Sequence, residues 1–283
     1  MSRRTFAWRA LSLVAPVALA SACSVFADLD GLAGGSLSRV DGGIGEGGGP
    51  SLDAATEEAS TPDAPCSGAL CTAYGRAVMA DAPTAYFRFD DASSAQANDV
   101  VGSSIVATLR AGARPTAGGS LHFETDGATL TLSGRVVTGA KVPFTIESWV
   151  RIDAALPSDA PFAAMDFPGD GAKRTGMWLV MDGATFRTET WAGGNHLFYA
   201  ASATTVAAAT WYHVVAGYSA AEDRDFLYVN GVPAPSAGPV KPGARIEPTG
   251  PARFGGMVGS IDDVAVYAAA LAPARIAAHF AAH

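Results

Sequence analysis

An acidic residue near the end of the chain is the first candidate for site chemistry. Asp262 opens the segment 262–267, where period-2 alternation would place its side chain on the same face as Val264 and Val266. If the valines face the core, the Asp262 carboxylate points inward and needs a partner, because burying a bare charge is costly. One candidate partner is Ca²⁺, which binds carboxylate and carbonyl oxygens. The alternatives are Arg88, backbone N–H groups, or simple exposure to solvent.

Aromatic residues outside the most regular segments form a second candidate group. Carbohydrate recognition needs flat apolar faces beside polar groups, and Trp and Tyr supply both. The segment from Trp191 to Tyr199 reads as a loop, and binding residues favour loops. The candidate ligand-binding residues are Trp178, Trp191, Asn195, His196 and Tyr199. The alternatives are ordinary strand packing for Trp178 and a loop without ligand contact for the segment that follows.

Motifs for catalysis are sparse. The sequence contains no Gly-x-Ser-x-Gly, P-loop or His-Glu-x-x-His motif, and its five histidines are scattered. His213 would share a strand face with Trp211 and Val215, which favours a satisfied core histidine over a metal ligand. We therefore expect that the protein is not an enzyme.

Short strands separated by turns must position these residues. Three turn signals lie between apolar stretches: Asp126-Gly127, Asp182-Gly183 and Asn230-Gly231. Alternating segments predict strands at 144–152, 211–215 and 226–229. Only Pro273 to His279 reads as a helix, with Ile276 and Phe280 on one face. This pattern predicts an all-β, antiparallel two-sheet jelly-roll sandwich with one short C-terminal helix.

Composition excludes several classes of protein. The chain has 283 residues, a net charge of −8 and 16% charged residues, without a long basic run, so we expect no nucleic-acid partner. The 32 Gly and 17 Pro argue against a helical bundle. Only the first apolar run approaches the length of a membrane span, which excludes a multi-span protein.

Residues 1–22 are typical of a signal peptide. Arg3, Arg4 and Arg9 precede or interrupt an apolar run over 10–22 that is too short to span a membrane. Cys23 follows small residues, and the arrangement resembles a bacterial lipoprotein signal, in which this cysteine is lipidated; plain secretory cleavage is the alternative. The arginine pair also resembles a twin-arginine export motif, so both that route and the general secretory route stay open. We expect export and a lipid anchor at the cell envelope or surface.

Residues 23–65 are expected to be the lipidated cysteine and a disordered, Gly-rich acidic linker. The segment cannot bury enough apolar surface to offset its ordering entropy. With Cys23 lipidated, Cys66 and Cys71 remain as a pair, and an oxidising compartment favours a disulfide between them. Two free thiols or half a metal site are the alternatives. The remaining residues, 66–283, are predicted to form one domain.

Six strings of residues follow one another in a characteristic order. They are Tyr74 to Phe89, Phe144 to Val150, Trp211 to Val215, Leu227 to Gly231, Gly259 to Tyr267, and Leu271 to Pro273. Together with an acidic loop from Asp91 to Gly102, they resemble the laminin-G-like, concanavalin-A-like jelly roll of secreted bacterial proteins, over nearly all of residues 72–283. The resemblance implies that residues 74–89 form the opening strand. It also places Trp149 and Trp211 in framework strings and therefore in the core.

The resemblance also implies a metal and raises the question of an activity. In related jelly rolls a structural calcium joins the closing aspartate to acids of the opening segment, which carries over to Asp262, Asp91 and Asp99, with Asp90 as a weaker match. Glucan hydrolases of the superfamily place carboxylates as Glu-x-Asp-x-Glu on one strand. The nearest string here, Glu124-Thr125-Asp126, lacks the third acid and reads as a turn.

These observations together predict an exported, lipid-anchored, monomeric cell-surface protein. Its laminin-G-like domain is expected to bind a carbohydrate or glycoprotein without catalysis. A structural or protein–protein interaction module of the cell envelope is the first alternative, and a glucan hydrolase-like enzyme is the second.

Overall fold

The computed structural model describes residues 72–92, 95–134, 142–154, 160–165, 176–182, 184–192, 195–237 and 251–283. Backbone contacts divide the chain into Met1–Ala59 and Ser60–His283, and every described residue belongs to the second unit. Cys23, Cys66 and Cys71 lie outside the described residues, as do the signal peptide and the linker, so export, lipidation and the disulfide stay predictions. No helix in the described part of the chain is long and apolar enough to cross a membrane.

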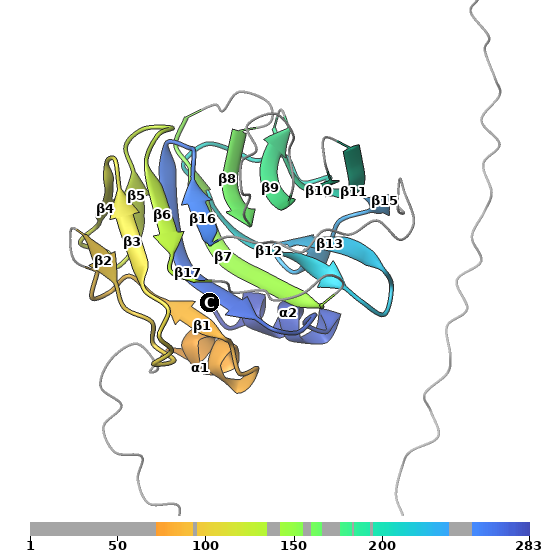
Figure 1. The fold of residues 1–283 in the computed structure, drawn as a ribbon, viewed down its shortest axis with the longest axis horizontal. Helices are drawn as coiled ribbons and strands as arrows, with labels where there is room; N and C mark the ends of the chain where they lie inside the picture. The colour runs from red at the N-terminus through yellow and green to blue at the C-terminus, as the bar shows by residue number, and fades with distance from the viewer. Residues whose placement is uncertain are drawn as a thin grey trace, which may run out of the picture. The chain divides into compact units, whose positions relative to one another are not determined.

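Two antiparallel sheets form most of the described structure (Figure 1). Sheet A contains β1 (Ala85–Phe87), β4 (Ala113–Pro115), β5 (Leu121–Phe123), β7 (Phe144–Ile152), β12 (Trp211–Ser219), β13 (Arg224–Val229), β14 (Val232–Pro233) and β17 (Gly259–Tyr267). Sheet B contains β2 (Gln96–Ala97), β3 (Ala107–Arg110), β6 (Thr129–Leu132), β8 (Ala160–Met165), β9 (Gly176–Asp182), β10 (Thr185–Ala192), β11 (Asn195–Ala201), β15 (Ser236–Ala237) and β16 (Ala252–Gly255). The predicted two-sheet antiparallel sandwich is confirmed.

Strand order places β7 and β17 near the middle of sheet A. The order is β14-β13-β12-β7-β17-β5-β4, with β1 also paired to β17, and sheet B runs β15-β11-β10-β9-β8-β16-β6-β3-β2. Strands far apart in sequence are therefore neighbours. The three long strands β12, β7 and β17 lie side by side, so their side chains form one continuous surface on each face of the sheet.

Strand β7 explains how both faces of sheet A are covered. Phe144, Ile146 and Val150 belong to a large core cluster that also contains residues of sheet B, so this face lies between the sheets. Trp149 belongs to a second, smaller cluster on the opposite face. Alternate side chains of one strand thus enter two different cores, as the period of two requires. We call the face that carries Trp149 the outer face of sheet A.

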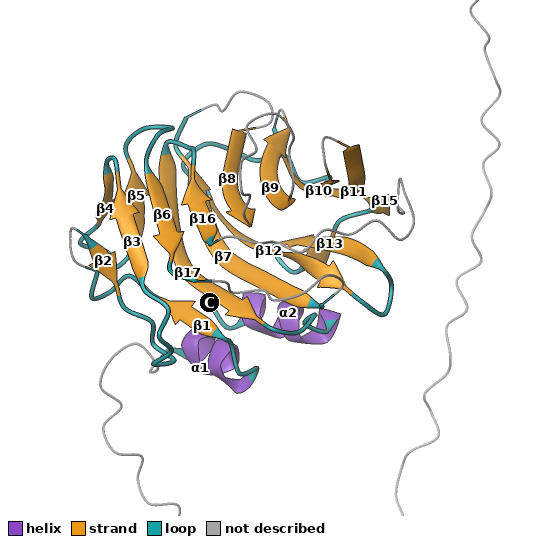
Figure 2. Ribbon diagram, viewed as in Figure 1, coloured by secondary structure: helices purple, strands orange, loops and turns teal. Residues whose placement is uncertain are grey.

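Two helices cover part of the outer face. Figure 2 shows α1 (Ala73–Ala80) and α2 (Pro273–Ala281) next to β1 and β17. Tyr74 and Val78 of α1 are buried in the same cluster as Trp149 and Tyr267. The helices therefore form a third layer over sheet A, and the sandwich is not bare on this side.

Helix α1 corrects the expected opening strand. The segment 74–89 was expected to be extended, but residues 73–80 are helical and only Ala85–Phe87 is a strand. Thr72 caps the helix, with its Oγ1 accepting a hydrogen bond from Gly75 N at 2.9 Å. Tyr74 and Val78, four residues apart, then lie on one buried face. Both the cap and this spacing were readable in the sequence.

Helix α2 confirms the predicted C-terminal helix and extends it to Ala281. Its buried residues are Ile276 and His279. Phe280, which was expected to share the buried face with Ile276, is 36% exposed. His279 instead faces the sheet, where its Nδ1 lies 3.0 Å from the buried carboxylate of Glu147.

A bulge in β17 corrects the expected direction of Asp262. Asp262 pairs with Trp149, whereas Ala265 pairs with Glu147, so β17 carries one extra residue in this stretch, and Asp263 adopts a φ of +50°. Ile261 and Val264, although three positions apart, are both in the core between the sheets. Asp262 therefore lies on the outer face opposite Trp149, and the expectation that it points inward with the valines is wrong.

Candidate functional site: a groove on the outer face of sheet A

A groove of about 590 Å³ lies on the outer face where the helices leave the sheet uncovered. Its lining side chains include Thr116, Ser120, Trp149, Arg151, Trp211 and Asp262. A smaller hollow of about 250 Å³ shares Gly118, Asp262 and His283 with it. The two hollows adjoin, and together we call them the outer groove.

Strand register brings the lining residues together. Trp149 of β7 lies opposite His213 of β12 on one side and opposite Asp262 of β17 on the other. Two positions further along β7, Arg151 lies between Trp211 and Ser260 in the same way. Directly opposed residues point to one face of a sheet, so segments far apart in the sequence contribute to a single surface.

The aromatic end of the groove combines flat rings with hydrogen-bond donors. The Arg151 guanidinium lies 5.4 Å from the centre of the Trp211 ring and is held by Asp153, at 2.8 Å from Nε and 3.0 Å from Nη2. Trp149 is only 6% exposed, and its Nε1 has no hydrogen-bond partner among the described residues. The His283 ring packs on Trp149 with centroids 3.8 Å apart. Trp211 is only partly buried, so part of its side chain is exposed in the groove.

The acidic end gathers three carboxylates around one arginine. Asp90, Asp262 and Asp263 line the smaller hollow together with Arg88. Arg88 Nη2 lies 3.2 Å from Asp90 Oδ2, and Arg88 Nε lies 3.5 Å from Asp263 Oδ1. Tyr86 donates its hydroxyl to Asp263 Oδ1 at 2.5 Å. The Asp262 carboxylate accepts the N–H of Asp263 at 2.8 Å.

Burial makes these carboxylates reluctant to ionise. Burial, followed by the charge of Asp263, raises the pKa of Asp262 to about 8. Burial also raises the pKa of Asp263 to about 6, although the hydrogen bond from Tyr86 and the charge of Arg88 act against it. At neutral pH, Asp262 therefore carries a proton for most of the time. The acidic end holds more carboxylates than its arginine neutralises.

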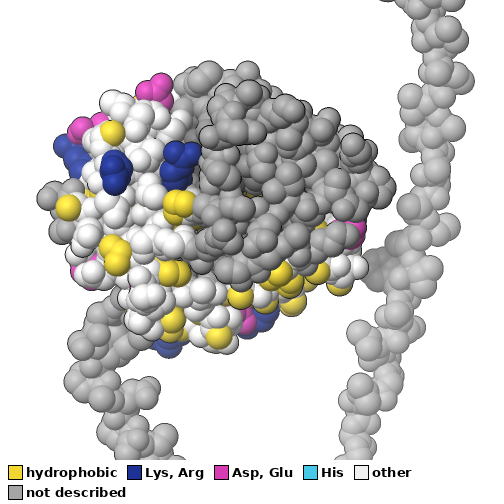
Figure 3. Space-filling view, in the orientation of Figure 1, with side chains coloured by type: hydrophobic (Ala, Val, Ile, Leu, Met, Phe, Trp, Pro, Cys, Tyr) yellow, Lys and Arg dark blue, Asp and Glu magenta, His cyan; other side chains and the backbone are white. Residues whose placement is uncertain are grey.

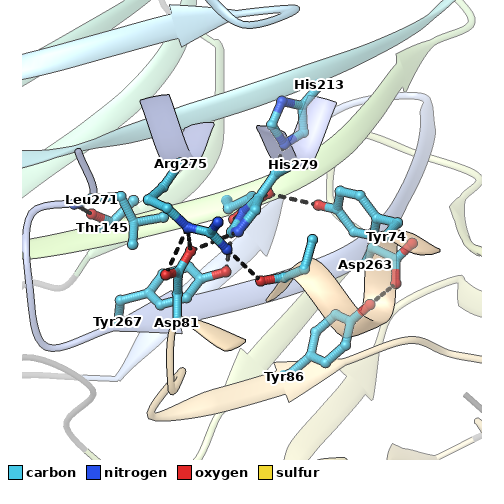
Figure 4. A network of polar contacts seen from close by, with 12 residues as sticks. Tyr74, Asp81, Tyr86, Thr145, His213, Asp263, Tyr267, Leu271, Arg275 and His279 are labelled. Carbon is cyan, nitrogen blue, oxygen red and sulfur yellow. Dashed lines mark hydrogen bonds and ion pairs between the residues drawn. The ribbon is translucent and has the colours of Figure 1, made fainter. Parts of the chain in front are cut away.

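Beside the groove, under the two helices, Glu147 forms a buried network that docks both helices. Figure 4 labels Tyr74, Tyr267, His213 and His279 of this network. Its carboxylate accepts hydroxyl groups from Tyr74 and Tyr267, each at 2.8 Å. His213 Nε2 lies 2.7 Å away and His279 Nδ1 lies 3.0 Å away. Burial alone would raise the pKa of Glu147, but the hydrogen bonds and charges of the two histidines bring it well below its ordinary value.

The network continues to the surface through Asp81. Both Asp81 oxygens lie 2.9 Å from Arg275 Nε, and His279 Nε2 lies 2.8 Å from Asp81 Oδ2. Burial lowers the pKa of His279, but Glu147 and Asp81 raise it further, so the net shift is upward. Because Glu147 and the two histidine side chains are fully buried, this cluster has no access for a substrate. We assign it a structural role.

The interpretation of His213 as a buried core histidine is confirmed, since it is fully buried and its Nε2 is bonded to Glu147, but its Nδ1 has no hydrogen-bond partner among the described residues. The importance of Glu147 was not predicted. Its alternation within β7 placed it on one face with Trp149, but nothing local indicated that two helices would bring a tyrosine and a histidine to it. Of the two framework tryptophans expected in the core, Trp149 is buried, whereas Trp211 lines the groove.

The three predicted calcium ligands are each engaged separately. Asp99 accepts backbone N–H groups from Tyr86 at 2.7 Å, Val101 at 3.1 Å and Ser103 at 2.7 Å, which fastens its loop to β1. Asp91 accepts the Asn98 side-chain amide at 3.0 Å.

Among the described residues, no group of three or more His, Cys, Asp or Glu side chains is arranged to hold a metal ion. The set predicted from the resemblance is therefore not assembled in this geometry. Calcium binding itself stays a prediction, and it is checked by thermal unfolding with added Ca²⁺ and with a chelator.

The predicted ligand-binding residues lie in sheet B, away from the strands that carry the groove. Trp178 is in β9, Trp191 is in β10, and Asn195, His196 and Tyr199 are in β11. Their side chains lie outside the described part of the structure, so their contacts stay untested.

The expected loop from Trp191 to Tyr199 is wrong, because Trp191 pairs with His196 and Ala192 with Asn195 in a β-hairpin. Gly193-Gly194 is a hairpin signal that the sequence already contained.

The string Glu124-Thr125-Asp126 follows β5 and forms a turn, closed by a hydrogen bond from Ala128 N to Thr125 O at 3.1 Å. Glu124 pairs with Arg114 at 2.8 Å on the surface. The prediction that this string is a turn is confirmed.

Comparison with known proteins now places the domain. A family model described as the concanavalin A-like lectin/glucanases superfamily matches residues 123–277. The chain belongs to this superfamily. No curated protein sequence matches it.

Solved structures with a fold similar to that of this chain include an enzyme and two binding domains. Trypanosoma rangeli sialidase matches with a TM-score of 0.55 and 18% identity, over 69% of this chain and 32% of its own. The binding domain of Paraclostridial Mosquitocidal Protein 1 matches with a TM-score of 0.56 and 13% identity, over 70% and 51%. The botulinum neurotoxin serotype D binding domain matches with a TM-score of 0.56 and 12% identity, over 72% and 52%. The chain thus spans about a third to a half of these proteins, and the likeness is one of fold.

Proposed function

We propose that this protein is an exported, lipid-anchored surface protein whose superfamily domain binds carbohydrate in the outer groove without catalysis. The observation that supports this most directly is that Trp211 of β12 lies opposite Arg151 of the neighbouring strand β7, with Trp149 two residues away on the same face. Sugar rings present apolar C–H faces and hydroxyl groups, and this groove offers the partly exposed Trp211 ring beside the Arg151 guanidinium. The membership in a lectin and glucanase superfamily is consistent with such a ligand.

A glycan array probed with the full chain, purified in detergent, tests this proposal. We expect binding to a restricted set of glycans and a loss of at least about tenfold in affinity for Trp211→Ala, because a stacked ring is removed. Trp191→Ala, in sheet B, is the matched control and should keep its affinity. Circular dichroism verifies that both variants are folded.

Each other result has a definite meaning. Loss of binding in Trp191→Ala alone would move the site to the β10–β11 hairpin. Absence of binding to any glycan would contradict the proposal and favour an envelope module whose partner is a protein.

Figure 3 shows acidic and basic side chains interspersed on the described part of one face, on the side of β3 and β6, so this part presents no extended patch of one sign.

Glycoside hydrolysis is a second candidate, favoured by one specific observation. Asp262, with its pKa near 8, holds a proton at neutral pH as a general acid must, and Asp90 lines the same hollow. Incubation with the glycans that bind, followed by measurement of new reducing ends, tests this activity. Release that disappears in Asp262→Asn would establish hydrolysis, whereas bound but intact glycans would leave non-catalytic binding as the function.

A further inference from the structure

The acidic end of the outer groove carries charge that the protein does not balance. Asp90, Asp262 and Asp263 face a single cation, Arg88, which reaches Asp90 and Asp263. Asp262 itself receives only a backbone N–H among the hydrogen bonds of this cluster. Because Asp263 is 7% exposed, the field of these carboxylates is less screened than it would be at the surface. At neutral pH Asp262 is mainly protonated, so Asp90 and Asp263 together exceed the charge of Arg88 by about one negative charge. A ligand cation placed here would meet this net negative charge and would favour ionisation of Asp262.

The neighbouring strand offers an unused donor. Trp149 lies directly opposite Asp262, is 6% exposed, lines the groove, and has no partner for its Nε1 among the described residues. A buried indole N–H ordinarily finds an acceptor, and sugar hydroxyl or ring oxygens are suitable acceptors. An oxygen acceptor near Trp149 and a positive group near Asp262 would therefore complement the groove.

At the acidic end, the backbone at Gly119 lies close to the Asp90 side chain. Gly119 adopts a φ of +83°, and a Cβ there would collide with the Asp90 carboxylate. Gly118 lines both hollows. Gly119 thus allows the 116–120 turn to lie against Asp90, whose carboxylate lines the smaller hollow.

We propose that the outer groove selects a glycan with free amino groups, such as a polymer of unacetylated hexosamine, with its ammonium group among Asp90, Asp262 and Asp263. This inference rests on the proposed function, because it takes the groove as the carbohydrate site. A hexosamine carries the cation and the oxygen acceptors on one ring, so it satisfies the carboxylates and Trp149 together. A neutral sugar satisfies only Trp149, and a simple amine satisfies only the carboxylates.

Calorimetric titration of the full chain in detergent tests this selectivity. The probes are glucosamine oligomers, the same oligomers fully N-acetylated, glucose oligomers of equal length, and oligolysine. We expect the aminated oligomer to bind at least about tenfold more tightly than its acetylated counterpart, because acetylation removes the charge. Asp262→Asn and Asp90→Asn should bring this ratio close to one.

A charge-matched control and the contrary results complete the design. Asp126→Asn removes an exposed carboxylate in a turn and should keep the wild-type ratio. Equal binding of aminated and neutral oligomers would overturn this inference while leaving the proposed function intact. Equally tight binding of oligolysine and the aminated oligomer would also overturn it, because the groove would then select its ligand by charge alone. No binding of any sugar would overturn the proposed function and this inference together.

Discussion

At the scale of single residues, two carboxylates one strand apart show how environment decides chemistry. Glu147 and Asp262 are both on the outer face of sheet A, and both are largely buried. Glu147 receives two hydroxyls and two imidazoles, so its pKa falls. Asp262 receives one N–H and lies beside Asp263, so its pKa rises to about 8. The number of donors around each group, rather than its burial, separates a structural anion from a group suited to a site.

Asp262 should make stability fall as the pH rises. Its folded pKa of about 8 exceeds its ordinary value of 3.8, so the folded state binds the proton more tightly and loses stability between these two values. The limit is about 1.4 kcal/mol for each pH unit in this window. Asp262→Asn should therefore raise the melting temperature by several degrees at pH 8.5 and change it little at pH 4.

Differential scanning calorimetry of wild type, Asp262→Asn and Asp126→Asn at both pH values measures this effect. His279, whose pKa is also raised, contributes stability that is lost above its ordinary value of 6.5, so wild type and variant must be compared at each pH. A variant that is not stabilised at pH 8.5 would show that Asp262 is more solvated than its surroundings indicate.

Glu147→Gln should be severely destabilising. The change removes the anion that two histidines face and leaves buried donors poorly matched, which costs about 3–5 kcal/mol in comparable buried pairs. Urea unfolding near pH 6 measures the loss, and Glu124→Gln on the surface should stay within about 0.5 kcal/mol of wild type. Because the folded pKa of Glu147 is lowered, its contribution is present above pH 4.5 and fades below it. A loss under about 1 kcal/mol would contradict the structural role.

At the scale of elements, the two helices decide where the groove lies. They cover the part of sheet A that carries Glu147 and leave the part that carries Trp211 open. Helix α1 is held by its cap at Thr72 and by Asp81, which Arg275 of α2 contacts. The bulge in β17 then brings Asp262 to the open part.

Thr72→Ala should loosen α1 selectively. Loss of the capping hydroxyl costs about 1 kcal/mol, and the first turn carries Tyr74, which donates to Glu147. We expect faster amide hydrogen exchange in 73–80 and little change in β7. Thr125→Ala, at an exposed turn, is the control. Uniform exchange in both variants would mean that the cap contributes nothing.

At the scale of the described domain, the core between the sheets and the outer groove lie on opposite faces of sheet A. The core between the sheets is apolar, and the outer face of sheet A holds the polar chemistry. Such a division leaves the packing of the sandwich independent of the site. The proposed lipid anchor would hold this domain at a membrane, and the proposed linker would set its distance from that membrane.

Cys23→Ser should release the protein from the membrane if the anchor is lipid on this side chain. Serine cannot form the thioether, so the variant should move from the detergent phase to the aqueous phase on phase partitioning. Cys66→Ser, which lies in the predicted disulfide, should stay in the detergent phase. An unchanged partition of Cys23→Ser would favour plain secretory cleavage or another anchor.

The sequence by itself determined the sandwich, its long strands and the C-terminal helix. Alternation over 144–152 and the turn signal at Asn230-Gly231 act through near neighbours, and the structure retains both in β7 and in the β13–β14 hairpin. The same reasoning identified His213 as a core residue. It missed α1, although the Thr72 cap was present, because the resemblance to a strand prevailed over local signals.

Only the tertiary structure decided the site. Simple alternation predicted that the Asp262 side chain points inward. The one extra residue of the bulge in β17 places it on the outer face instead. Trp149, Trp211 and Asp262 are more than 50 residues apart in sequence, and strand order alone makes them neighbours. Pairing partners and bulges depend on the energy of the whole sheet, which no short window of sequence contains.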